Sequence, residues 1–503
     1  MIQTFPTDAI RLEVSKQLDS KRRHELGQFL TPLPVARYMA SLFAPNSNPI
    51  IRLLDAGAGI GTLTSVFLER WFVKELDAPS IELTAYEIEP LLRSHLEQVL
   101  SSFQKRAKLQ GLDLQISIES YDFIEDAVDR IQFFNSQNFT HAILNPPYKK
   151  IHSQSQHRKS LSAIGIETVN LYSAFVALAV NLMANGGEIV AIIPRSFCNG
   201  PYYRPFRELI LRNTSIEHIH LFTARDKAFQ DDEVLQENVI MHLVKGKLQE
   251  TVTISTSTDE TFIDYAIQEF AFEEIVQPND TEHFIHIPTT HHQFIDEQYI
   301  PAKKTTQANY SLEELDIQVS TGPIVDFRLK DYLRDLPEND TVPLLYPSHF
   351  VDFKVNWPNL KNKKPNAVLI SNETIKWLFP KGFYTVVRRF SSKEEQRRIF
   401  ANVIDPNQLD FAYLGFENHL NVFHRNKQGL PEKLAHGLAV YLNSSFIDLA
   451  FRRFSGHTQV NATDLRLLKY PSLDILLRLG EWAKSQISLT YLAIDDFVTK
   501  NIS

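Results

Sequence analysis

The chain has 503 residues, of which 43% are hydrophobic and 22% are charged, and its formal net charge is −8. This composition excludes a disordered chain, and the acidic balance gives no overall basic charge of the kind that marks many nucleic-acid binders, although a local basic cleft is compatible with it. The single cysteine, Cys198, excludes an internal disulfide and a cysteine-based zinc cluster.

Two parts of the chain differ in pattern, in agreement with the two domains that its length predicts. Between residues 50 and 245, near-continuous apolar strands alternate with helical patterns, which predicts a parallel α/β sheet covered on both faces. One such helix follows Asn170 and is expected to stop at Gly186 and Gly187. The expected strands are Ile50–Asp55, Ile81–Glu87, Leu114–Glu119, Thr140–Asn145, Glu188–Pro194, Ile216–Phe222 and Asn238–Val244.

Beyond residue 250, polar stretches, proline-containing connections and short strands predict a second, irregular domain. One long helix is expected there from Pro431 to Phe454, with proline in its first turn. The sequence has no uncharged apolar stretch of about 18 residues and no secretory signal at its start, so we expect a soluble, cytoplasmic protein without membrane contact.

A glycine-rich turn follows the first strand, in the segment LLDAGAGIGTLT at residues 53–64. Gly57, Gly59 and Gly61 allow the backbone to turn tightly and to approach a ligand at the carboxyl end of the strand. The spacing differs from that of dinucleotide sites, and the absence of GK[ST] excludes a P-loop. Glu87, which ends the second strand, is suited to accept hydrogen bonds from two ribose hydroxyls. The alternative is a structural turn with a solvated Glu87.

The third strand leads into SYDF, at residues 120–123. Asp122 can accept a hydrogen bond from an adenine amino group, and Phe123 can flank the ring. A plain turn aspartate is the alternative, and it is favoured unless the neighbouring segments also point to a nucleotide.

The fourth strand ends in NPPY, at residues 145–148. The proline pair restricts two φ angles and pushes Asn145 toward extended backbone, so that its carboxamide and the Pro146 carbonyl can converge as two rigid acceptors. Two acceptors suit adenine N6, because holding both hydrogens of this poorly nucleophilic amine favours a pyramidal nitrogen whose lone pair points toward an electrophilic methyl group. Tyr148 is suited to stack on the base.

These segments occur in an order that is typical of one family. DAGAGIG, YEIE, YDF and NPPYKK follow one another, and GQFLTPLPVARYMASLF at residues 27–43 precedes them. On these motifs the chain resembles the γ-class adenine-N6 DNA methyltransferases of restriction-modification systems, with a TaqI-like catalytic domain and the overall length and style of the PstI and BsuBI enzymes. The resemblance covers residues 20–250 well and is weaker beyond them.

The resemblance implies a fold and a cofactor. The fold is the α/β class I methyltransferase fold, a Rossmann-like sheet of seven mostly parallel strands, in a catalytic domain at residues 1–250 with an N-terminal helical extension. Residues 251–503 are then a mixed α+β target-recognition domain for DNA. The methyl donor is S-adenosyl-L-methionine, and no metal is expected.

The resemblance also assigns roles to individual residues. Thr31 is expected to cap a helix that begins at Pro32, and the N-terminus of such a helix suits the methionine carboxylate. Phe229 is expected against the second face of the target base, with Phe222 as its competitor and a core role open for both. The residues implied at the cofactor are Thr31, Asp55, Ala56, Gly57, Gly59, Glu87, Ile88, Asp122, Phe123 and Asn145. Those implied at the target adenine are Asn145, Pro146, Pro147, Tyr148 and Phe229.

The implied function is site-specific methylation of adenine N6 on a base flipped out of duplex DNA, as the modification half of a type II restriction-modification system. The implied partner is double-stranded DNA, bound by a monomer, and a cognate restriction endonuclease is expected genetically without direct contact. A minority of the basic residues is expected to contact phosphates or guanines. The candidates are Lys149, Lys150, Arg158, Lys159, the cluster at 361–364, Arg388, Arg389, Arg397, Arg398, Arg452 and Arg453.

Other interpretations remain open. NPPY also occurs in methyltransferases that act on RNA or on a protein glutamine, although those enzymes are usually smaller. A non-catalytic DNA-binding or nicotinamide-binding protein could retain the same sheet, an interpretation that the complete set of cofactor motifs disfavours. A bifunctional restriction enzyme is not expected, because the cofactor motif begins near Gly27 and leaves no room for an N-terminal nuclease.

Overall fold

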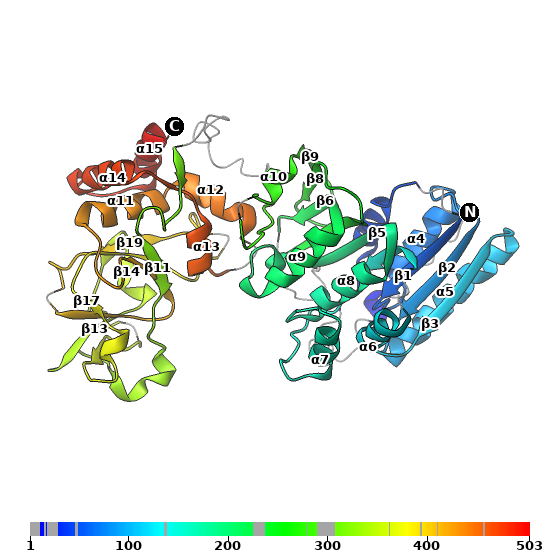
Figure 1. The fold of residues 1–503 in the computed structure, drawn as a ribbon, viewed down its shortest axis with the longest axis horizontal. Coiled ribbons are helices and arrows are strands. Elements are labelled where there is room, and N and C mark those ends of the chain that lie inside the picture. Colours follow the sequence, from blue (N-terminus) through cyan, green and yellow to red (C-terminus); the bar gives the residue numbers. More distant parts are fainter. Residues whose placement is uncertain are drawn as a thin grey trace. The chain divides into compact units, whose positions relative to one another are not determined.

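The computed structural model describes residues 11–14, 17, 29–45, 49–134, 138–224, 237–278, 280–288, 307–361, 363–392, 395–409, 411–455 and 458–502. The chain forms two compact units, Met1–Thr290 and His291–Ser503 (Figure 1). The boundary lies later than the predicted 250/251. The reason is that β8 (Val252–Ser257) and β9 (Ala266–Phe270) continue the sheet of the first unit.

The first unit is built on a sheet of nine strands in the order β3-β2-β1-β4-β5-β7-β6-β8-β9. The seven predicted strands are all present within it. β8 and β9 extend the sheet beyond the seven strands that were expected. β1 to β5 run parallel, and β7 is antiparallel to both β5 and β6. The first seven strands are β1 (Ile50–Ala56), β2 (Ser80–Tyr86), β3 (Asp113–Glu119), β4 (Phe139–Leu144), β5 (Met183–Pro194), β6 (Thr214–Phe222) and β7 (Asn238–Lys245).

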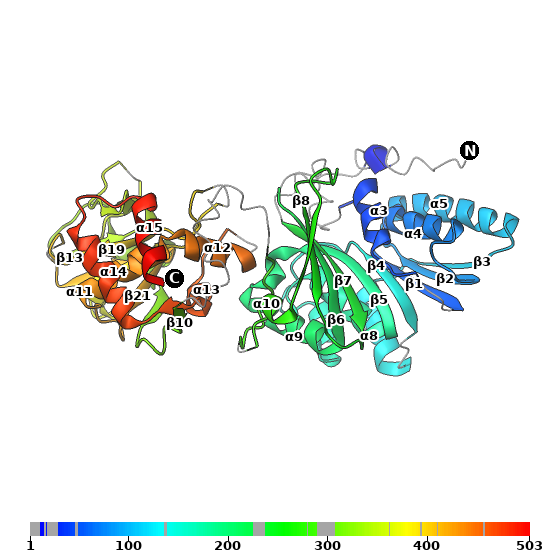
Figure 2. The same ribbon diagram turned by 90° about the horizontal axis from the view of Figure 1, so that it is seen from above.

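The central strands of this sheet are buried on both faces, which explains why they are apolar at consecutive positions. In β1, Leu53 packs into one hydrophobic core and Leu54 into another. Figure 2 shows helices above and below the sheet. On the face of Leu53 lie α3 (Leu33–Ser41), α4 (Thr62–Phe72) and α5 (Pro90–Leu109). On the face of Leu54 lie α6 (Phe123–Asp129), α8 (Leu171–Leu182) and α9 (Arg204–Asn213).

One helix of the first unit ends earlier than expected, and a short helix forms in a segment for which no element was predicted. α8 ends at Leu182 instead of continuing to Gly186, because Met183 already pairs with Phe139 of β4 and the glycines lie in an irregular stretch of β5, where Gly186 has φ +78°. In the polar segment after NPPY, α7 (Gln156–Ala163) begins after Ser155, whose hydroxyl accepts from the Arg158 N–H at 3.3 Å.

The second unit contains two main sheets and a group of helices. One sheet has the order β11-β21-β18-β19, and the other β12-β16-β13-β20-β17. The strands of the first are β11 (Gln318–Thr321), β18 (Tyr384–Arg388), β19 (Ala401–Ile404) and β21 (Leu420–His424). Those of the second are β12 (Leu333–Arg334), β13 (Thr341–Leu345), β16 (Ala367–Leu369), β17 (Phe379–Pro380) and β20 (Tyr413–Phe416). The helices are α11 (Glu432–Leu442), α12 (Ser445–Phe454), α13 (Ala462–Leu467), α14 (Leu473–Ser485) and α15 (Tyr491–Ile502).

The single helix predicted from Pro431 to Phe454 is two helices, α11 and α12. Asn443 interrupts it, because its carboxamide accepts from the Ala401 N–H and donates to the Ala401 carbonyl, at 3.1 and 2.8 Å. Ser444 then caps α12 by accepting from the Ile447 N–H. In the part of the chain that the structure describes, none of the helices has the length and apolar character needed to cross a bilayer.

Candidate active site

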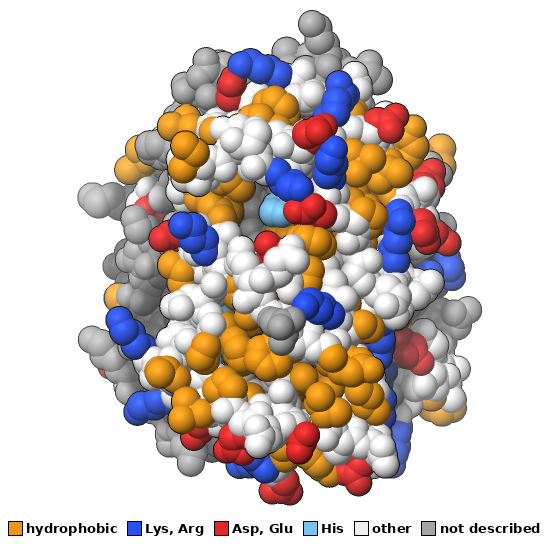
Figure 3. Space-filling model, turned by 90° about the vertical axis from the view of Figure 1, so that its left-hand side faces the viewer, with side chains coloured by type: hydrophobic (Ala, Val, Ile, Leu, Met, Phe, Trp, Pro, Cys, Tyr) orange, Lys and Arg blue, Asp and Glu red, His pale blue; other side chains and the backbone are white. Residues whose placement is uncertain are grey.

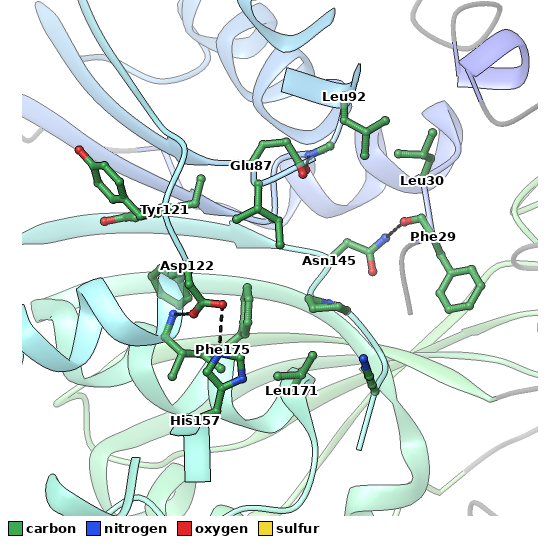
Figure 4. Close-up of a pocket in the computed structure, with 18 residues that line it drawn as sticks. Phe29, Leu30, Glu87, Leu92, Tyr121, Asp122, Asn145, His157, Leu171 and Phe175 are labelled. Carbon is green, nitrogen blue, oxygen red and sulfur yellow. Dashed lines mark hydrogen bonds and ion pairs between the residues drawn. The ribbon is translucent and has the colours of Figure 1, made fainter. Parts of the chain in front are cut away.

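A cavity opens at the carboxyl ends of β1 to β4, where the sequence places its glycine turn, Glu87, SYDF and NPPY. It contains about 930 Å³ of space without protein atoms, part of it open to solvent. Figure 4 shows Asp122 and His157 on one side of the cavity and Asn145 and Phe29 on the other. The predicted residues that line it are Gly57, Gly59, Glu87, Ile88, Asp122, Phe123, Asn145 and Pro147.

The glycine turn forms one wall of the cavity. The N–H groups of Gly57 and Ala58 donate to the Tyr86 carbonyl at 3.0 and 2.9 Å, which fastens the turn to the end of β2. Gly57 and Gly59 have φ of +82° and +58°, a region that favours glycine. Because neither residue carries a side chain, the backbone itself faces the cavity.

Asp55 and Ala56 do not line the cavity, although both precede the turn. Both are fully buried, and the Thr64 hydroxyl donates to Asp55 Oδ2 at 2.5 Å. Burial raises the pKa of Asp55 to about 7. In this structure Asp55 ties β1 to α4, and any contact with a cofactor stays a prediction.

Glu87 lines the cavity and is 4% exposed. The Gly59 N–H donates to its Oε2 at 2.9 Å, and the Glu89 N–H donates to its Oε1 at 2.7 Å. Each carboxylate oxygen keeps a second lone pair for a ligand. Burial raises the pKa of Glu87 to about 7, with the two backbone N–H groups acting in the opposite direction.

Asp122 also lines the cavity, and it caps α6. Its Oδ1 accepts from the Ile124 N–H at 2.8 Å, and its Oδ2 lies 3.0 Å from His157 Nε2. Burial acts to raise the pKa of Asp122, but His157 and the α6 N–H groups outweigh it, so this pKa lies below its usual value. The same hydrogen bond raises the pKa of His157. Phe123 completes this wall, with its ring centroid 4.9 Å from that of Phe175.

Asn145 stands at the opposite side of the cavity and has a fully bonded amide nitrogen. Its Nδ2 donates to the Phe29 carbonyl at 2.8 Å and to Thr31 Oγ1 at 2.9 Å. The Tyr148 hydroxyl lies 3.2 Å from Asn145 Oδ1 and 3.2 Å from the Ile192 carbonyl, so it can donate to either. Burial raises the pKa of Tyr148 well above its usual value, so the phenol is a neutral donor.

Thr31 differs from its predicted role as a helix cap. α3 begins at Leu33 with Pro32 at the capping position, and Pro32 has no side-chain group that could accept a capping hydrogen bond. Thr31 is 4% exposed and is not among the residues that line the cavity. Its hydroxyl accepts from Asn145 instead, because the chain before α3 runs beside the end of β4.

The other residues expected at the target base separate into three groups. Pro147 lines the cavity and Pro146 is buried behind it. The competitor Phe222 is 1% exposed and packs against His220 and Phe262, so it belongs to the core. Phe229 lies outside the described residues.

Comparison with known proteins identifies the family. Residues 68–229 match the model of the Eco57I restriction-modification methylases. Over 494 residues the chain is 52% identical to the type II methyltransferase M.BsuBI of Bacillus subtilis, a match that covers 97% of this chain and 95% of the relative. The chain belongs to the type II methyltransferases of restriction-modification systems. It is also 43% identical to the type II methyltransferase M.PstI of Providencia stuartii over 471 residues, which cover 93% of this chain and 91% of that one.

The fold of this methyltransferase agrees with its family. The strand order β3-β2-β1-β4-β5-β7-β6, with β7 antiparallel, is that of the class I methyltransferase fold. Among solved structures, the type IIL restriction-modification enzyme MmeI is similar with a TM-score of 0.55 at 11% identity, covering 98% of this chain and 75% of that one. At this identity the likeness concerns the fold alone.

The cavity of the methyltransferase also contains residues that the motifs did not indicate. His157 could be found only as a polar residue of the segment after NPPY, and Phe175 only as part of an apolar helical stripe. Neither pattern indicates a ligand, because both are common on ordinary helices. Leu92, Ile124 and Leu171 also line the cavity from outside the motifs. Phe29, Leu30, Tyr86, Tyr121 and Lys149 line it from within the motifs, although no role at the cofactor was predicted for them.

Two of the basic residues proposed for DNA contact are buried in the second unit of the methyltransferase. Arg397 pairs with Asp495 at 2.5 Å, and both side chains are 8% exposed. Arg398 is fully buried, and its Nε donates to Ser391 Oγ at 3.1 Å. These arginines hold helices and loops of the folded unit together, so burial leaves them out of the minority of candidates that could contact DNA.

Several of the remaining basic candidates are paired with acidic side chains. Arg388 lies 2.9 Å from Glu395, and Arg452 lies 2.6 Å from Asp448. On the face shown in Figure 3, Lys and Arg side chains alternate with Asp and Glu. The exposed candidates are Lys149, Lys150, Lys159, Lys361, Lys363, Lys364 and Arg453.

Proposed function

We propose that this methyltransferase transfers a methyl group from S-adenosylmethionine to N6 of an adenine that is flipped out of a specific duplex DNA sequence. The observation that carries the proposal is the position of Asn145, which lines the same cavity as Glu87 and Asp122. An acceptor for an aromatic amine thereby shares one cavity with two carboxylates suited to a nucleoside.

The chemistry of the cavity fits S-adenosylmethionine. Glu87 offers one lone pair on each oxygen toward ribose hydroxyls, and Asp122 Oδ2 keeps one lone pair beside His157 for the adenine amino group. Leu30, Ile88, Phe123 and Phe175 supply apolar walls for the adenine ring. We infer that the backbone of Gly57 and Gly59 lies against the remainder of the cofactor.

S-adenosylmethionine supplies, when it is bound, a methyl group on a positively charged sulfur. The protein holds the acceptor: Asn145 Oδ1 and the Pro146 carbonyl accept the two N6 hydrogens, which turns the nitrogen lone pair out of the base plane. With S-adenosylmethionine bound, N6 held in this way would take the methyl group, and the electron pair of the broken carbon–sulfur bond would stay on sulfur. The proton that N6 loses goes to water, so no side chain of shifted pKa is required as a base.

DNA is the proposed substrate, and the biological role is the modification half of a type II restriction-modification system. The family and the relatives M.BsuBI and M.PstI support this role. MmeI, whose fold is similar, was solved in complex with DNA. We propose that the second unit contributes target recognition and that Tyr148 and Phe229 stack on the flipped base. Such stacking offsets the few kcal/mol that extrusion costs.

The test is transfer of a labelled methyl group from S-adenosylmethionine into plasmid DNA from a host without this protein, followed by nucleoside analysis. The expected product is N6-methyladenine, and Asn145→Ala is expected to lower the rate by at least about 100-fold. Asn213→Ala is the matched control, because Asn213 donates one hydrogen bond to the Leu209 carbonyl on α9 and does not line the cavity. Near wild-type turnover by Asn145→Ala contradicts the mechanism.

Three other outcomes point to the alternative functions. Methyladenosine confined to RNA would identify RNA as the substrate in place of DNA. Methylglutamine in protein would identify a protein glutamine as the substrate. Absence of any binding heat with S-adenosylmethionine in calorimetry indicates a non-catalytic protein.

A further inference from the structure

The carboxamide of Asn145 is held in one of its two possible orientations. Both hydrogens of Nδ2 have acceptors, the Phe29 carbonyl at 2.8 Å and Thr31 Oγ1 at 2.9 Å. Rotation of the amide by 180° would place Oδ1 against the Phe29 carbonyl, which cannot donate. Figure 4 shows the bond between Asn145 and Phe29 at the edge of the cavity.

The orientation of this amide decides what the target amine meets. In the observed orientation Oδ1 faces away from Phe29 and toward the Tyr148 hydroxyl, 3.2 Å away. A carbonyl oxygen has two lone pairs, so an amine can bind Oδ1 beside or in place of this phenol. In the rotated orientation the amine would meet N–H groups, which repel its own hydrogens.

Thr31 is placed to act on Asn145 and not on the cavity. Its side chain is nearly fully buried, it makes no capping bond to α3, and it does not line the cavity in which the cofactor is expected. Among the described residues, the Thr31 side chain hydrogen-bonds to Asn145, which is 114 positions away in the chain.

We propose that Thr31 is a positioning residue for methyl transfer. Thr31 Oγ1, together with the Phe29 carbonyl, fixes the Asn145 carboxamide so that Oδ1 is presented to the target amine before the base arrives. An acceptor that is already oriented requires no reorganisation during the reaction, which is the condition for efficient electrostatic stabilisation of a transition state. This inference rests on the proposed function, and it replaces the expectation that Thr31 serves the methionine carboxylate.

The experiment compares Thr31→Val and Thr31→Ser in the full-length protein. Valine keeps the branched shape and removes the acceptor, whereas serine keeps the hydroxyl. Three quantities are measured: the single-turnover rate of labelled methyl transfer into plasmid DNA, the Kd for S-adenosylmethionine by calorimetry, and the midpoint of thermal unfolding. Thr214→Val is the matched control, because the Thr214 hydroxyl is buried and donates to the Ile210 carbonyl at 2.9 Å, away from Asn145.

We expect Thr31→Val to lower the single-turnover rate roughly tenfold, the value of one buried hydrogen bond, with the Kd for S-adenosylmethionine changed less than about twofold. Thr31→Ser restores most of that rate, and Thr214→Val leaves it unchanged. If valine lowers the unfolding midpoint below the assay temperature, Thr31→Ala is measured in its place with the same expectation.

Two results overturn the inference. A tenfold rise in the Kd for S-adenosylmethionine at an unchanged single-turnover rate assigns Thr31 to the cofactor. If Thr31→Val keeps both the wild-type transfer rate and the wild-type Kd for S-adenosylmethionine, the Thr31 hydroxyl has no role in the reaction. The identity of the base methylated by the wild-type protein tests the proposed function separately, because a product other than N6-methyladenine refutes that function whatever Thr31→Val does to the rate.

Discussion

Glu87→Gln is expected to weaken S-adenosylmethionine binding and to remove its dependence on pH. The free carboxyl has a pKa of about 7, raised by burial, and ribose hydroxyls bind its ionised form better. Affinity therefore reaches its plateau above pH 8 and falls as the pH drops through 7. At pH 6 only about one-tenth of Glu87 is ionised, so the wild-type affinity is roughly tenfold below the plateau.

The glutamine variant loses both the charge and one backbone contact. Glutamine has one acceptor oxygen, whereas Glu87 accepts from both Gly59 and Glu89 N–H groups, so one of these donors is left facing an amide N–H. Hydrogen bonds to a charged group are worth about 1.5–3 kcal/mol against 0.5–1.5 for neutral ones, and this difference of about 1–1.5 kcal/mol predicts an affinity roughly 5–13-fold lower at pH 8.

Calorimetric titration with S-adenosylmethionine between pH 6 and 8 measures both effects. Glu97→Gln is the control, since Glu97 is an exposed carboxylate on α5. Asp55→Asn is the second comparison, because burial also raises the pKa of Asp55 to about 7. A pH dependence that persists in Glu87→Gln and disappears in Asp55→Asn refutes the assignment of the ribose contact to Glu87.

Three further predictions concern stability and the target base. The folded state keeps Asp55 protonated up to about pH 7 while the unfolded chain ionises near 4. Asp55 therefore lowers the stability as the pH rises from 4 to 7, so the unfolding midpoint of the wild type falls relative to that of Asp55→Asn over this range. Arg397→Ala leaves the buried Asp495 without its ion-pair partner. It is expected to lower the free energy of unfolding in urea by about 3–5 kcal/mol, without a selective loss of DNA affinity. Phe222→Ala costs about 3–5 kcal/mol of stability in the same assay, whereas Phe229→Ala lowers the transfer rate.

Much of the first unit could be predicted from the sequence, because local patterns and the fold agree there. Strands buried on both faces are apolar at consecutive positions, and the turns after them contain the polar residues that face the cavity. Glu87 and Asn145 directly follow the parallel strands β2 and β4, and Asp122 lies in the turn between β3 and α6, so the three residues had to meet at one edge of the sheet.

The remainder depended on contacts between distant segments, which sequence patterns do not contain. The sequence pattern places β8 and β9 in the second domain, because both strands are short and polar. In the structure β8 pairs with β6 and therefore belongs to the first unit. The break between α11 and α12 comes from Asn443, whose partner Ala401 is 42 positions away. Thr31 and Pro32 have the local signature of a helix start, but the hydroxyl of Thr31 binds Asn145 across the cavity edge.

Sequencing of DNA from a host that expresses this protein tests the central claim most directly, namely that NPPY activates an adenine amine. The account predicts N6-methyladenine at one recurring sequence with the wild-type protein and unmodified adenine at that sequence with Asn145→Ala. The same modified sites in the Asn145→Ala host, or no modified adenine in either host, would contradict it.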